Sequence, residues 1–101
     1  MATTLTIDYS INGVDKNLIL TEVNRCSEDF RENYVSLNIG CLDEVSNQTL
    51  SEIMRSTVSK ITYIEESETH EFTNYTSVTS ITRSYQGEGS VLSFTFRNYF
   101  N

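Results

Sequence analysis

TLTIDYSINGVDKNLILT, residues 4–21, carries the strongest structural signal in the chain. At its centre stands the dipeptide Asn12-Gly13, which favours a two-residue type I′ turn between antiparallel strands. On both sides of this dipeptide, apolar side chains recur at every second position, the spacing of a strand with one buried face. These positions are Leu5, Ile7, Tyr9, Ile11, Val14, Leu18 and Leu20. The stretch therefore predicts a β-hairpin that covers a hydrophobic core.

The turn also fixes the register of this hairpin, because a two-residue loop determines how its flanking residues pair. Ile11 is expected opposite Val14, which sets Leu5 opposite Leu20 and gives one face a row of apolar cross-strand neighbours. The intervening side chains face the other way and are polar. They are Thr4, Thr6, Asp8 and Ser10.

The middle of the chain predicts a loop, a strand and a helix. Residues 22–33 lack the alternation of apolar and polar side chains and contain both acidic and basic residues, which favours a loop or a short helical turn. Alternation returns over 34–41, where Gly40 either ends a third strand or marks a bulge. Apolar side chains at spacings of three and four then predict one amphipathic helix over about 47–59, preceded by the N-cap candidate Ser46.

Two further hairpins are expected after the helix. In the first, 61–66 pairs with 69–75, and a turn at Ser67-Glu68 sets Tyr63 opposite Phe72.

In the second, 78–85 pairs with 90–97 across the turn 86–89, which sets Ile81 opposite Phe94. The first glycine of this turn supplies the positive φ that a type II′ turn needs.

These elements predict a single domain, residues 1–101, of the α+β class and mostly β. Antiparallel hairpins form a small sandwich or a barrel-like sheet, with one amphipathic helix packed against it.

Composition and charge exclude several classes of function. Fourteen acidic against seven basic residues give a net charge of −7, and binding to a nucleic-acid backbone requires a basic face. No apolar run approaches the roughly 20 residues that span a bilayer. The N-terminus also lacks the basic and apolar regions of a secretory signal peptide. We therefore expect a protein that binds neither nucleic acid nor membrane and is not secreted through a signal peptide.

The chain offers few groups for catalysis. His70 is the only histidine, and Cys26 and Cys41 have no spacing typical of metal ligands. We expect two free, partly buried thiols. A nucleophilic pair of His70 with either thiol lacks a local signature, and no glycine-rich phosphate loop is present. The expectation is a protein that is not an enzyme, has no cofactor and takes no small-molecule substrate.

The acidic run 65–71 is the densest group of polar side chains. Its carboxylates and imidazole either keep a hairpin end solvated, contact a partner, or hold a metal ion. Strand alternation argues against the metal, because it sends neighbouring carboxylates to opposite faces. The candidate partner-binding residues of this run are Glu65, Glu66, Glu68 and Glu71.

The C-terminus is the second candidate contact region. Arg97, Tyr99 and Phe100 are residue types enriched at protein interfaces. The two aromatic rings either fold back over an open end of the core or contact another chain.

The segments 61–64, 72–75 and 90–96, together with the absence of proline, resemble small proteins encoded by bacteriophages. The resemblance implies a non-enzymatic β domain that joins copies of itself or neighbouring phage or host proteins through strand edges, hairpins and termini. A tail, connector or accessory structural protein of the virion fits this description, with the virion or the host cytoplasm as its location. The alternative is a small acidic inhibitor of a host nuclease or defence complex, whose carboxylates replace nucleic-acid phosphates on a basic partner.

Overall fold

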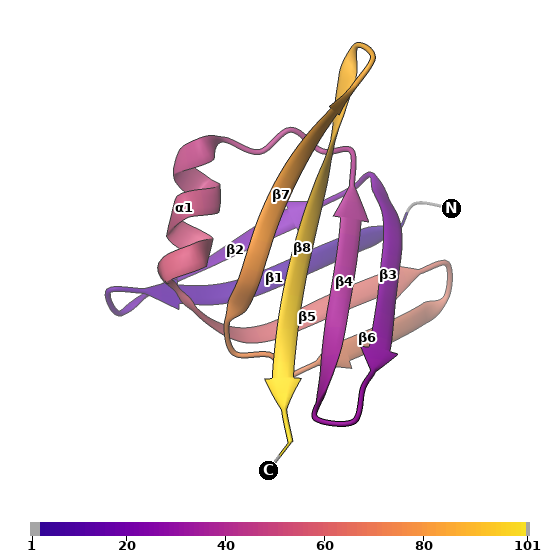
Figure 1. The fold of residues 1–101 in the computed structure, drawn as a ribbon. Coiled ribbons are helices and arrows are strands. Elements are labelled where there is room, and N and C mark those ends of the chain that lie inside the picture. Colours follow the sequence, from indigo (N-terminus) through magenta and orange to yellow (C-terminus); the bar gives the residue numbers. More distant parts are fainter. Residues whose placement is uncertain (1–2, 101) are drawn as a thin grey trace.

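The computed structural model describes residues 3–100 and forms two antiparallel four-stranded sheets with one helix (Figure 1). The first sheet has the strand order β2-β1-β5-β6, and the second has the order β3-β4-β8-β7. The strands are β1 (Thr4–Ile11), β2 (Val14–Leu20), β3 (Val23–Phe30), β4 (Tyr34–Cys41), β5 (Thr57–Glu65), β6 (Glu68–Phe72), β7 (Val78–Gln86) and β8 (Gly89–Tyr99), and the helix is α1 (Asn47–Arg55). The two sheets stay separate and stack, so the fold is a β-sandwich.

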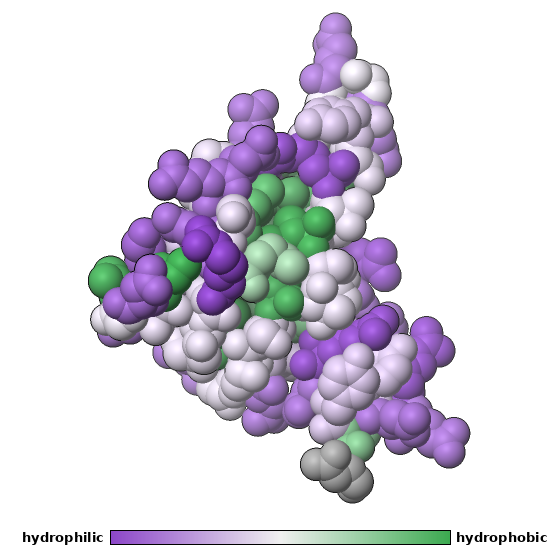
Figure 2. Space-filling model, turned by 60° about the vertical axis from the view of Figure 1, so that its left-hand side comes forward, coloured by the Kyte–Doolittle hydropathy of each residue, from purple (hydrophilic) through white to green (hydrophobic). Residues whose placement is uncertain are grey.

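The core lies between the inner faces of the two sheets. Leu5, Ile7 and Ile61 of the first sheet are fully buried, as are Phe94 and Phe96 of the second. The helix lies at one side of the sandwich and contacts both β7 and β1 (Figure 1). Figure 2 brings this side forward and shows apolar side chains at its centre, framed by hydrophilic ones. Within residues 3–100, no helix is both long and apolar enough to cross a membrane.

The register predicted for the first hairpin is confirmed. Ile11 pairs with Val14 and Leu5 pairs with Leu20. Asn12 and Gly13 both have positive φ, 54° and 78°, as a type I′ turn requires.

The helix is shorter than predicted, because it ends at Arg55 and the chain enters β5 at Thr57. Ser56 terminates it in an extended conformation, with its hydroxyl donating to the carbonyl of Ile53 at 2.8 Å. The prediction to 59 was wrong because Val58 and Ile61 are both buried and lie three residues apart, which imitates a helical period. A β-bulge in β5 causes this spacing, since one extra residue opposite the Asp8–Tyr9 step keeps both side chains on the inner face.

The loop predicted over 22–33 is also wrong, because β3 occupies Val23–Phe30. This strand lies at a sheet edge and half of its side chains stay exposed, so its sequence lacks an apolar alternation. Of the two alternatives for Gly40, a strand end is wrong because β4 continues to Cys41; a bulge is present, but it lies in β3, where the pairing shifts between Val23 and Arg25 opposite this glycine. A Cβ on Gly40 would lie 2.8 Å from the Asn24 side-chain oxygen, so the bulge leaves no room for a side chain there.

The two C-terminal hairpins were predicted with different success. In the last one, Ile81 pairs with Phe94 across a turn in which Gly87 has φ of 62°, as expected. In the other, the turn lies at Glu66-Ser67 and not at Ser67-Glu68, so Tyr63 pairs with His70. The shift moves each pairing by two residues, which leaves the paired side chains on their predicted faces. The strand β6 ends at Phe72 and does not reach Tyr75 as expected.

The turn residue Glu66 generates a stability prediction. Its φ of 54° lies in the left-handed region, which Asn tolerates better than Glu. Glu66→Asn should therefore raise the free energy of unfolding by about 0.5–1 kcal/mol. Urea unfolding measures the change. Glu68→Asn is the control, because Glu68 is a strand residue without positive φ; an equal gain in both variants would contradict the explanation.

Candidate interaction surface

Three neighbouring strands of the second sheet bring aromatic residues together where β3 ends, β4 begins and β8 ends. The register sets Tyr34 opposite Tyr99 and Phe30 opposite Val35. We name the resulting group the C-terminal aromatic surface. It consists of Phe30, Tyr34, Arg97, Tyr99 and Phe100.

On the outer face of the sheet, Arg97 is held between two tyrosines. Its guanidinium carbon lies 4.6 Å from the centre of the Tyr34 ring, a cation–π contact, and its Nη1 donates to the Tyr99 hydroxyl at 3.4 Å. The two tyrosine rings lie 5.5 Å apart. The hydrogen bond to Tyr99 raises the pKa of Arg97 above its ordinary value, so the guanidinium stays charged. These contacts hold the three side chains against one another.

On the inner face, Phe30 and Phe100 extend beyond the area that the first sheet covers. Phe30 is 70% exposed and Phe100 is 48% exposed, although both occupy inward-facing positions. With Phe72 at the end of β6 and Tyr75 in the segment that follows, they line an open hollow of about 410 Å³. The N–H of Phe100 donates to the carbonyl of Asn33 at 2.7 Å, which ties the end of β8 to the β3–β4 turn.

The sequence pointed to three of these five residues. Arg97 and Tyr99 lie together on the outer face, whereas Phe100 lies at the same end of the sheet on the inner face. The strand β8 extends to Tyr99, so Tyr99 is a paired strand residue. Phe30 and Tyr34 were missed because they come from the β3–β4 hairpin, whose first strand was predicted as a loop. The available signal was that Phe30 lies within a charged segment, and this does not reveal which strands bring it to Tyr34.

Three of the four candidate acidic residues of the β5–β6 hairpin gather at its end, and the fourth, Glu71, lies apart from them. Glu65 and Glu68 pair directly at the hairpin end, and Glu66 lies in the turn. Glu71 faces the outer side, 3.8 Å from the ammonium of Lys60, whereas the carboxylate of Glu68 lies 3.5 Å from Nε2 of His70. Among residues 3–100, no three side chains of the metal-binding types converge on a common point.

A second hollow, of about 310 Å³, opens between the edge strands β3 and β6. Cys26 and His70 both line it, with Tyr63 stacked on the imidazole at a ring distance of 6.1 Å. The Tyr75 hydroxyl donates to the carboxylate of Glu28 at 2.7 Å and so ties the segment after β6 to β3.

Both cysteines are free, as predicted. Burial raises the pKa of the Cys26 thiol to about 11, and the carboxylates of Glu28 and Glu65 add to the shift. Burial also raises the pKa of Cys41 to about 11. At neutral pH both thiols are protonated, and a protonated thiol is a poor nucleophile.

Comparison of the chain with protein-family models, with curated proteins and with solved structures gives no match. The geometry described above is therefore the basis of the functional proposal.

The thiol environment generates a pH prediction. Because each pKa moves from 9.0 to about 11, labelling of the folded protein by iodoacetamide at pH 7 should be about hundredfold slower than for an ordinary thiol. The rate should rise about tenfold per pH unit towards pH 11.

Since folding favours the protonated thiols, their contribution to stability is present below pH 9 and is lost as the pH rises through 11. Labelling in urea supplies the reference rate, and Cys26→Ser isolates the contribution of Cys41. Equal labelling rates in the folded and unfolded protein at pH 7 would contradict the assignment.

Proposed function

We propose that this protein is a non-catalytic interaction module that binds a protein partner through the C-terminal aromatic surface. The observation behind this proposal is that Phe30, Tyr99 and Phe100 are 70%, 61% and 48% exposed at one end of one sheet, beside a charged arginine. Tyrosine and arginine are among the residues that dominate binding energy at interfaces. Burial of a large apolar side chain contributes about 1.5–3 kcal/mol, so a partner that covers these rings gains a substantial binding energy.

The arrangement also limits the entropic cost of binding. Arg97 and the two tyrosines hold one another in place, and the main chain of Phe100 is bonded to the β3–β4 turn. Side chains that are already positioned lose less freedom when a partner arrives.

A structural or accessory role in a bacteriophage, in the virion or the host cytoplasm, is the narrower form of this proposal. Its support is the resemblance in composition. The acidic inhibitor is the competing form, and its support is the group of carboxylates at the end of the β5–β6 hairpin, where Glu65 pairs with Glu68 and Glu66 lies in the turn.

Capture from the cells that make the protein tests the proposal. A tagged chain should recover a partner, and the triple variant Phe30→Ser, Tyr99→Ser and Phe100→Ser should reduce recovery by about tenfold or more. Because the contact is largely apolar, the complex should persist as salt is raised.

Two controls make the capture experiment decisive. Ile19→Ser removes an exposed apolar side chain from the outer face of the first sheet and should leave recovery unchanged. Glu65→Gln with Glu66→Gln and Glu68→Gln neutralises the hairpin end and should also have no effect. Loss of the partner in the glutamine variant, or at high salt, would favour the acidic inhibitor and contradict the proposed surface.

A further inference from the structure

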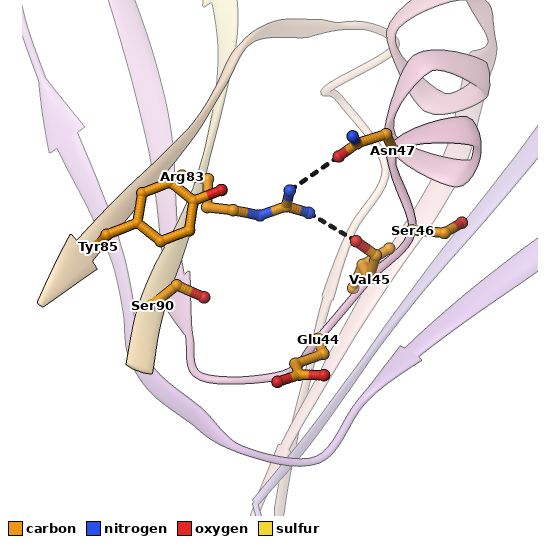
Figure 3. A pocket seen from close by; sticks show the side chains of 7 residues that line it. All are labelled: Glu44, Val45, Ser46, Asn47, Arg83, Tyr85 and Ser90. Carbon is orange, nitrogen blue, oxygen red and sulfur yellow. Dashed lines mark hydrogen bonds between the residues drawn. The ribbon is translucent and has the colours of Figure 1, made fainter. Parts of the chain in front are cut away.

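The β7–β8 hairpin extends beyond the rest of the sandwich, at the end of the second sheet opposite the C-terminus (Figure 1). Tyr85 occupies an inward-facing position on this extension, and it is 78% exposed because no strand of the first sheet lies beneath it. Below the hairpin lies an open hollow of about 380 Å³, whose lining includes Tyr85, Glu44 and Arg83 (Figure 3).

Arg83 is fixed in this hollow. Its Nη1 donates to the side-chain oxygen of Asn47 at 2.7 Å, and its Nη2 donates to the carbonyl of Val45 at 2.6 Å (Figure 3). Both hydrogen bonds are donated by N–H groups in the plane of the guanidinium, so they do not occupy its two faces, which can stack on an aromatic ring.

The part of β7 that extends beyond α1 is also the least protected of the sheet edges (Figure 1). Proteins usually prevent an exposed edge strand from pairing with another chain by placing charged side chains on it or by keeping the strand short. The guarding features elsewhere are Asp15 and Lys16 in β2, Arg25, Glu28 and Asp29 in β3, and Glu68 and Glu71 in the five-residue β6. β7 has nine residues and a single charge, Arg83, which is directed under the sheet towards α1.

The hairpin register shows which main-chain groups of β7 are free. Gln86 pairs with Gly89 across a two-residue turn, so Gln86 and Ser84 direct their N–H and C=O groups to β8. Arg83 and Tyr85 direct theirs to the open edge. Within residues 3–100, no main-chain hydrogen bond outside the sheets and the helix involves β7.

We propose that β7 binds β7 of a second copy of this chain, antiparallel, with Ser84 on the two-fold axis. This register sets Tyr85 of each copy opposite Arg83 of the other and pairs the free main-chain groups of both residues. It places the exposed ring on the open face of the fixed guanidinium, twice in one symmetric contact.

Charge supports the choice of a second copy as the occupant. The chain as a whole is acidic, but β7 itself carries only Arg83, and the nearest carboxylates are Glu88 in the turn and Glu44 in the hollow. Two copies therefore meet here without the repulsion that paired β6 strands, each with two carboxylates, would create. The contact lies at the other end of the sheet from the C-terminal aromatic surface and does not depend on the proposed function.

Opposite charges at position 85 test this register. By sedimentation equilibrium, the full chain should form a dimer, and Tyr85→Lys should weaken it by about tenfold or more, because each lysine meets an arginine. Tyr85→Glu should keep dimer affinity within about threefold of the wild type, since each glutamate meets an arginine. Overall charge alone predicts the reverse order, because the lysine variant is the less acidic chain. A wild-type monomer at every concentration, equal effects of the two variants, or the reverse order would overturn the proposal.

A cross-link provides a second measurement that does not depend on side-chain charge. Residues opposite each other in a non-hydrogen-bonded antiparallel pair have Cα atoms about 4.5 Å apart, within reach of a disulfide. Ser84→Cys should therefore form an intermolecular disulfide on oxidation, and Ser80→Cys, away from the axis on the same strand, should not. Equal cross-linking of the two variants would overturn the register. The Phe30, Tyr99 and Phe100 triple variant should still dimerise, which separates this contact from the proposed partner surface.

Discussion

The contact between the inner faces of the two sheets is the constraint on which the rest of the structure depends. Leu5, Ile7 and Ile61 pack from one side against Phe94 and Phe96 from the other, and all five are fully buried. Because strand side chains alternate, placing these residues inside directs their neighbours outside. The outer faces are consequently rich in serine, threonine and asparagine.

The same constraint explains where the exposed aromatic residues lie. Phe30, Phe100 and Tyr85 all occupy inward-facing positions of the second sheet, but each lies beyond the area that the first sheet covers. An aromatic side chain at such a position faces the same way as the core residues, but the first sheet leaves it uncovered. The two ends of one sheet therefore present apolar surface that a second protein can bury, which is the physical basis of both proposals.

Local signals were sufficient for much of the fold. The first hairpin and the last were predicted in register because Asn12-Gly13 and Gly87 determine their turns. Errors arose where a non-local feature changed the period. The bulge in β5 gave Val58 and Ile61 the three-residue spacing of a helix. The strand β3 lies at a sheet edge, where its sequence does not need alternating apolar and polar residues.

The candidate surface was less predictable than the fold. Arg97, Tyr99 and Phe100 are contiguous enough to be noticed in the sequence, whereas Phe30 joins them through the pairing of β3 with β4 and of β4 with β8. That pairing is a property of the assembled sheet. Likewise, the exposure of Tyr85 follows from the length of the β7–β8 hairpin relative to the first sheet, which a sequence pattern does not encode.

Site-specific photo-crosslinking tests most directly the claim that the uncovered inward positions are contact sites. A benzophenone side chain replaces Phe100 in one variant, Ile19 in a second and Glu68 in a third, and each is irradiated in the cells that make the protein. The account predicts a discrete cross-linked product with another protein from position 100 and none from positions 19 and 68. A product from position 19 or 68, with none from position 100, would contradict it.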